Sequence, residues 1–163
     1  MHYMKKILLM IATCLTLTAC GDDIVSIKDN DYSFFGHLEI QALSKKPLSN
    51  ADIMLSDFRG RDDLKSVTLW IDGEKSESKC LSDTAILLND KKLRPITVKL
   101  EKKDEQELSY SAKYSFDEYL EFFAKNNKVM ISSCGINHVL TEDEKGGLAR
   151  ITKAWIKFTN KAS

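Results

Sequence analysis

The 163-residue chain has little proline and glycine, with two and seven residues respectively, and no excess of either charge among its 24 basic and 24 acidic side chains. So few prolines and glycines, without an internal repeat, exclude a collagen-like, low-complexity or long disordered chain. The balanced charge gives no indication of nucleic acid or of another strongly charged partner. The chain also lacks the Gly-x-Ser-x-Gly elbow of serine hydrolases and any glycine-rich phosphate loop. These absences favour one folded domain without a catalytic motif.

Long hydrophobic runs are missing too, apart from one near the N-terminus. Lys5 and Lys6 are followed by an almost entirely apolar run over residues 7–17 and then by small residues. The run is too short to span a bilayer, which takes about 20 helical residues. A basic start, an apolar run and a zone of small residues are typical of a secretory signal. The alternative is a buried N-terminal helix or strand, but a core element would need neither the basic start nor the abrupt polar exit.

The signal ends in Leu17-Thr18-Ala19-Cys20, which resembles the lipobox of bacterial lipoproteins, a leucine followed by two small residues and a cysteine. The resemblance implies that residues 1–19 are a signal peptide, that cleavage precedes Cys20, and that its thiol carries diacylglycerol. Acyl chains contribute about 0.8 kcal/mol per buried CH₂, so a multiply acylated cysteine anchors stably in a lipid bilayer. We therefore expect a lipidated tether over residues 20–31 and a single globular periplasmic domain over residues 32–163.

The residue directly after Cys20 indicates which membrane holds the lipid anchor. In Gram-negative lipoproteins an acidic residue at this position usually means retention at the inner membrane, whereas this chain has Gly21 there. The resemblance therefore implies the outer membrane, facing the periplasm, with the inner membrane as the alternative.

The chain has four cysteines, at positions 14, 20, 80 and 134, and only two of them remain available for a disulfide in the expected mature protein. Cys14 lies in the expected signal and Cys20 is the expected lipidation site. Cys80 and Cys134 remain together in an oxidising compartment, where thiols pair. We expect a Cys80–Cys134 disulfide, and two buried free thiols are the alternative.

Alternating apolar residues predict most of the secondary structure as strands. Asp72-Gly73 is a hairpin signal, which predicts a turn between strands at 65–71 and 75–81. Ile24, Val25 and Ile27 leave open a pairing of the tether with a sheet edge. The other predicted strands lie at 34–42, 84–88, 95–101, 107–114 and 129–134, with a hairpin between 95–101 and 107–114.

Helical spacing is confined to a few segments. Ser115 and Glu118 form a capping box that predicts a helix over 116–125. Residues 49–64 are ambiguous, and a short helix over 51–58, capped by Ser49 or Asn50, is the interpretation they suggest. A second box at Thr141–Glu144 is interrupted by two glycines, so residues 148–158 fit either a helix or a strand. The whole pattern predicts an α+β fold, a mainly antiparallel sheet with one or two helices packed on it.

The candidate chemistry gathers between Ser132 and Glu144. Cys134, His138 and Glu142 suggest a Cys–His nucleophile pair with a carboxylate, or a metal site. Against both, Cys134 has an oxidation partner in Cys80, and no metal-binding motif accompanies it. We expect a strand here that is held by the Cys80–Cys134 disulfide, with no cofactor and no metal. His37 is expected to be a solvated or edge histidine.

One aromatic residue suggests a partner. Phe122 is off the helical stripe of Phe116, Tyr119, Leu120 and Phe123, so it would contact a partner if exposed and fill the core if not. An anchored, compact, disulfide-bonded domain without catalytic residues predicts a binding module, such as an immunity protein or an inhibitor of a toxin or cell-wall-active enzyme. A structural or accessory component of an envelope secretion or conjugation machine is the alternative, and an enzyme is not expected.

Overall fold

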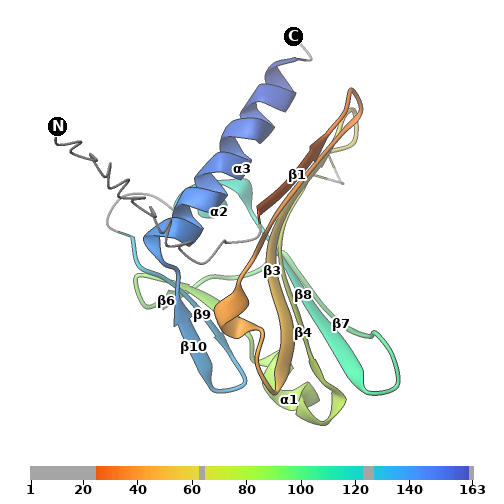
Figure 1. Ribbon diagram of the computed structural model, residues 1–163, viewed down its shortest axis with the longest axis vertical. Coiled ribbons are helices and arrows are strands. Elements are labelled where there is room, and N and C mark those ends of the chain that lie inside the picture. The colour runs from red at the N-terminus through yellow and green to blue at the C-terminus, as the bar shows by residue number, and fades with distance from the viewer. Residues whose placement is uncertain (1–24, 63–64, 123–126, 162–163) are drawn as a thin grey trace, which may run out of the picture.

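A computed structural model describes residues 25–62, 65–122 and 127–161, which form two antiparallel β-sheets and three α-helices (Figure 1). This arrangement confirms the predicted α+β fold. The predicted signal peptide, the lipobox and Cys20 lie outside the described residues.

The larger sheet has six strands in the spatial order β1-β2-β3-β4-β8-β7, and the smaller sheet has four in the order β10-β9-β5-β6. The larger sheet contains β1 Val25–Asp29, β2 Ser33–Glu39, β3 Leu48–Phe58, β4 Ser66–Glu74, β7 Thr97–Lys102 and β8 Glu107–Tyr114. The smaller sheet contains β5 Ala85–Leu88, β6 Lys91–Lys92, β9 Val129–Ser133 and β10 Ile136–Val139. The helices are α1 Ser78–Ser82, α2 Phe116–Leu120 and α3 Glu142–Asn160, with short 3₁₀ turns η1 Gln41–Leu43 and η3 Lys75–Glu77.

The hydrophobic core lies between one face of the larger sheet and a layer made of α3 and the smaller sheet (Figure 1). The rings of Phe34 on β2 and Phe158 on α3 meet at a centroid distance of 5.8 Å. Gly36 lets β2 and α3 approach closely, because a Cβ added there would lie only 2.6 Å from Cγ2 of Ile151 on α3. Every second residue of β3 also points into the core, as the period of a strand requires: Ala51, Ile53 and Leu55.

The predicted helix over residues 51–58 is wrong, because these residues belong to β3 and pair with both β2 and β4. The alternation of β3 is broken in the sequence by Asp57, which occupies an inward position. Its carboxylate accepts a hydrogen bond from Nε1 of Trp155 on α3. A partner distant in the sequence thus satisfies the buried carboxylate of Asp57.

The predicted turn at Asp72-Gly73 is also wrong, since β4 continues through both residues. A Cβ on Gly73 would lie 3.1 Å from Cδ2 of Leu81 and 3.2 Å from the carbonyl oxygen of Pro47. Close packing rather than a turn therefore explains this glycine. Residues 75–81, predicted as a strand, form η3 and most of α1 instead.

Several predicted strands are confirmed. The hairpin expected over 95–101 and 107–114 is β7–β8, and the runs at 84–88 and 129–134 are β5 and β9. The strand expected over 34–42 ends sooner, at Glu39, and is followed by η1.

Both capping boxes start helices. Ser115 Oγ accepts from the Glu118 amide at 3.2 Å at the start of α2, and α2 ends at Leu120, short of the predicted 125. Residues 123–126 of that prediction lie outside the described part of the chain. At α3, Thr141 Oγ1 accepts from the Glu144 amide at 3.1 Å, and the helix runs through both glycines. Residues 148–158 are therefore helical, and the strand alternative is wrong.

Within the segment predicted as a tether, residues 20–31, Val25–Asp29 form the edge strand β1 and so belong to the folded domain. The pairing left open for Val25 and Ile27 is confirmed, and Ile24 lies outside the described residues. A Cβ added to Gly147 of α3 would lie 3.1 Å from Cγ2 of Val25, so β1 lies directly beside α3.

Candidate partner-binding surface

The larger sheet has a second face, opposite the core, which we call the outer face. α3, the smaller sheet and the core cluster lie on the other side of the sheet (Figure 1). The register aligns His37 with Met54 and Asp52 with Trp70 across neighbouring strands. Phe35 is 38% exposed. Its ring lies 6.0 Å from that of His37. The outer face thus carries aromatic, methionine and polar side chains in adjacent rows.

The Trp70 side chain is held in place by a buried carboxylate. Asp72 is only 3% exposed and accepts a hydrogen bond from Trp70 Nε1 at 2.9 Å. The same carboxylate accepts from the Ser109 hydroxyl and from Lys103 Nζ, the latter at 2.6 Å. The hydrogen bond to Asp72 also raises the pKa of Lys103. Three donors therefore compensate the burial of Asp72 and orient the indole.

A second carboxylate lies beside the indole. Asn50 Nδ2 donates to Oδ2 of Asp52 at 2.6 Å. Desolvation by burial raises the pKa of Asp52, against the opposing effect of the Asn50 hydrogen bond. Together with Met54 and Trp70 these residues line a shallow hollow of about 290 Å³. The hollow therefore offers an incompletely solvated carboxylate next to apolar surface.

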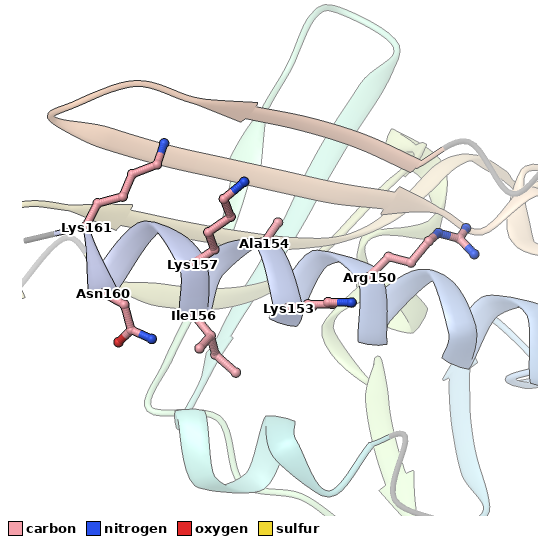
Figure 2. A pocket seen from close by; sticks show the side chains of 7 residues that line it. All are labelled: Arg150, Lys153, Ala154, Ile156, Lys157, Asn160 and Lys161. Carbon is pink, nitrogen blue, oxygen red and sulfur yellow. The ribbon is translucent and has the colours of Figure 1, made fainter.

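α3 forms a different kind of surface on the opposite side of the molecule. A groove of about 710 Å³ follows the helix. Figure 2 shows Lys157 and Lys161 extending toward the β1–β2 hairpin, while Ile156 and Asn160 point away from it. The groove is lined by Arg150, Lys153, Ala154, Ile156, Lys157, Asn160 and Lys161. We call it the basic groove.

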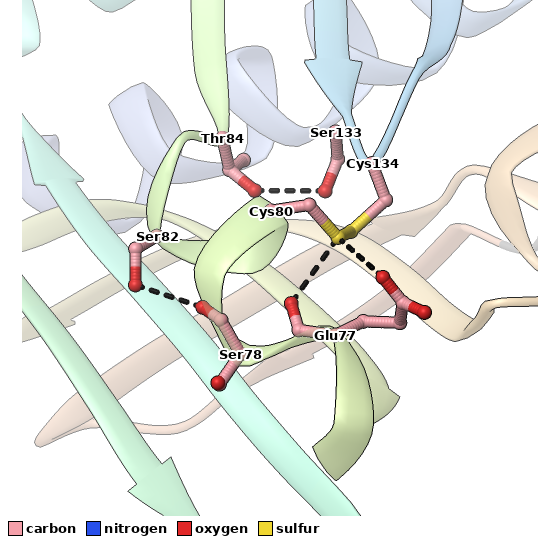
Figure 3. The surroundings of a disulfide bond; sticks show 7 residues. All are labelled: Glu77, Ser78, Cys80, Ser82, Thr84, Ser133 and Cys134. Carbon is pink, nitrogen blue, oxygen red and sulfur yellow. Dashed lines mark hydrogen bonds between the residues drawn. A yellow bond between two sulfur atoms is a disulfide. The ribbon is translucent and has the colours of Figure 1, made fainter.

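The predicted Cys80–Cys134 disulfide is confirmed (Figure 3). It joins α1 to the turn between β9 and β10, where Cys134 and Gly135 both have positive φ, as a two-residue hairpin turn requires. Beside it, the hydroxyls of Thr84 and Ser133 are buried and hydrogen-bonded at 2.8 Å. The bridge thus connects the end of the larger sheet to the smaller one.

The structure does not assemble the Cys134, His138 and Glu142 constellation. Cys134 is bonded to Cys80, so it offers neither a nucleophilic thiolate nor a thiolate ligand. His138 Nε2 lies 2.8 Å from the carboxylate of Glu144, not from that of Glu142. Glu144 in turn accepts from the Thr141 amide at 2.7 Å and caps α3. Glu142 is an exposed partner of Lys145 at 3.1 Å.

Phe122 is fully buried, with 0% of its surface exposed. Its ring packs against Tyr114 and Tyr119 at centroid distances of 6.4 Å and 5.6 Å. Burial also raises the pKa of Tyr119 to about 12. The reading of Phe122 as a partner-binding residue is therefore wrong, and the core reading is right. His37, by contrast, is a half-buried residue of the outer face.

Comparison of the chain with protein-family models, curated proteins and solved structures finds no significant match. Within residues 25–62, 65–122 and 127–161, none of the helices combines the length and hydrophobicity needed to cross a bilayer.

Proposed function

We propose that this protein is a bacterial lipoprotein, anchored through acylated Cys20, whose domain binds a protein partner through the outer face of the larger sheet. The lipobox and the signal-like segment before it support the anchor. The indole of Trp70, fixed by Asp72 on a sheet face that no other element of the described residues covers, is the observation that supports the binding surface. Tryptophan, phenylalanine and methionine are enriched in the centres of protein interfaces.

The shape of the outer face favours a macromolecular partner over a small molecule. The hollow beside Trp70 is shallow and, at about 290 Å³, lies at the lower end of the range of about 300–1,000 Å³ for small-molecule pockets, which usually bury most of the ligand. A rigid aromatic side chain costs little conformational entropy on binding, so the fixed indole is suited to a broad contact. A donor from a partner would also compensate the desolvated carboxylate of Asp52.

Within this class, an immunity protein or an inhibitor of a toxin or cell-wall-active enzyme fits best, at the outer membrane and facing the periplasm. Such proteins need an anchor, a compact stable domain and one presented face, and no catalytic residues. A toxin gene beside this one would support that assignment. A secretion or conjugation operon would support an accessory subunit instead.

Site-specific photocrosslinking in the native host tests the binding surface. Benzoylphenylalanine at Phe35, on the outer face, is expected to yield a discrete protein adduct. The matched control is Leu120 on α2, which has a similar exposure of 44% and should yield none. Trp70→Ala should weaken the adduct formed from position 35. Equal adducts from both positions, or none from position 35, would contradict the proposed surface.

The anchor is tested separately by mass spectrometry of the N-terminal peptide. The expected peptide begins at Cys20 and carries acyl chains. A chain that retains residues before Cys20, or an unmodified Cys20, would contradict the anchor and leave the outer face untouched.

A further inference from the structure

The charge of α3 changes sign along its length. Its first turn contains Glu142, Asp143 and Glu144, and the sequence from Lys145 to Lys161 contains no acidic residue at all. Four cations of that segment line the basic groove at helical spacing, which places them on one side of the helix: Arg150, Lys153, Lys157 and Lys161.

These cations are largely uncompensated. Lys161 Nζ lies 3.4 Å from Asp29. In the described part of the chain, Arg150, Lys153 and Lys157 have no carboxylate within ion-pair distance. Ile156, 45% exposed, adds apolar surface to the groove. Basic side chains combined with apolar ones along a helix are the composition of surfaces that lie on anionic membranes.

The position of β1 links this groove to the lipid anchor. β1 lies beside α3, since Val25 approaches Gly147 and Asp29 pairs with Lys161. Cys20 precedes Val25 by five residues, so the chain between them spans at most about 18 Å. The stretch of α3 from Arg150 to Lys161 is about 16 Å long. The anchored cysteine therefore keeps the bilayer within reach of the whole groove.

We propose that the basic groove lies on the membrane leaflet that holds acylated Cys20 and binds the phosphate groups of its anionic phospholipids. This inference rests on the lipid anchor proposed above. Positive charge in the groove is complementary to these headgroups, and the short connection to Cys20 favours the leaflet over a separate acidic protein. The outer face of the sheet, on the side opposite α3, then points into the aqueous space.

The energetics of such a surface are additive to a first approximation. One lysine or arginine near an anionic surface strengthens association about fivefold, and salt screens the effect. Replacing Arg150, Lys153 and Lys157 by glutamine should therefore weaken headgroup association on the order of 100-fold. The acylated cysteine retains the protein at the bilayer, and a second, electrostatic contact through the groove would strengthen that attachment.

The test uses the lipidated protein reconstituted in vesicles of phosphatidylcholine, with or without 30 mol% phosphatidylglycerol. With Cys20 acylated and Cys80 and Cys134 bonded, Ile156→Cys introduces a single thiol for a fluorophore. A quencher attached to lipid headgroups should quench this probe at least twofold more in the anionic vesicles, and 0.5 M salt should reverse the difference. A probe at Val98→Cys, 51% exposed on the far edge strand β7, is the matched control and should not respond.

Three results would overturn the inference. If the protein floats with neutral vesicles but the probe at position 156 does not respond to phosphatidylglycerol, the groove does not bind headgroups, although the anchor holds. An unchanged response in the folded Arg150→Gln, Lys153→Gln, Lys157→Gln variant has the same meaning. If the protein fails to float with neutral vesicles, the anchor itself is wrong, and the inference falls with it.

Discussion

Replacing both Cys80 and Cys134 by alanine removes the covalent connection between α1 and the β9–β10 turn. The bridge closes a loop with a sequence separation of 54 residues. The chain-entropy relation gives about 14 cal/mol/K for a loop of this length, or about 4 kcal/mol at 25 °C. Domains of this size have a total stability of about 5–15 kcal/mol, so the variant should be folded but marginal.

Guanidinium unfolding followed by circular dichroism measures this loss directly. The oxidised protein, the same protein reduced with a phosphine, and the double alanine variant should give three curves. The second and third should both lie about 4 kcal/mol below the first in free energy of unfolding. The reductant should leave the alanine variant unchanged, which is the control. A loss below about 1 kcal/mol would refute the reasoning, because the unfolded chain would then gain little freedom from opening the loop.

Substitutions at four positions test other parts of the structure. Burial raises the pKa of Asp52, so the stability from this group is present at low pH and is lost as pH rises through the raised folded pKa. Asp52→Asn should therefore raise Tm at pH 7 but not at pH 3, and a lower Tm at pH 7 would contradict this. Thr141→Ala should cost about 1 kcal/mol in chemical denaturation by removing the cap of α3, whereas Thr141→Ser should restore it. Phe122→Ala should cost about 3–5 kcal/mol and Phe35→Ala less than about 1 kcal/mol, so equal losses would contradict the assignment of one to the core and the other to the outer face.

Features with a local cause were predictable from the sequence. The β7–β8 hairpin follows from alternation on both sides of a charged turn. The caps at Ser115 and Thr141 follow from hydrogen bonds between residues three apart. The disulfide followed once the lipobox had left two cysteines in an oxidising compartment.

Features with a distant cause were not predictable in this way. Asp57 is tolerated inside because Trp155, nearly a hundred residues later, donates to it. Gly73 is small because Leu81 and the backbone of Pro47 lie against it. A hairpin signal and a packing glycine are identical in sequence, so only the assembled fold distinguishes them.

The candidate binding surface was predictable only in part from the sequence. The alternation of Val67, Leu69 and Ile71 places Trp70 on the opposite face of the strand, and that inference needs no structure. Met54 was missed because β3 was interpreted as a helix. The clustering of the two depends on the register between β3 and β4, which pairing at a distance determines.

The location of β1 has a mechanical consequence. If Cys20 is held in a membrane, any force between the bilayer and a bound partner enters the domain through Val25, the first residue of an edge strand. The hydrogen bonds to β2 lie perpendicular to the strand, so a pull along β1 loads all five of its residue pairs at once. A pull away from the sheet would instead open them one after another, beginning at Val25. The direction in which the chain leaves the membrane therefore decides how much tension the domain can sustain before its first strand detaches.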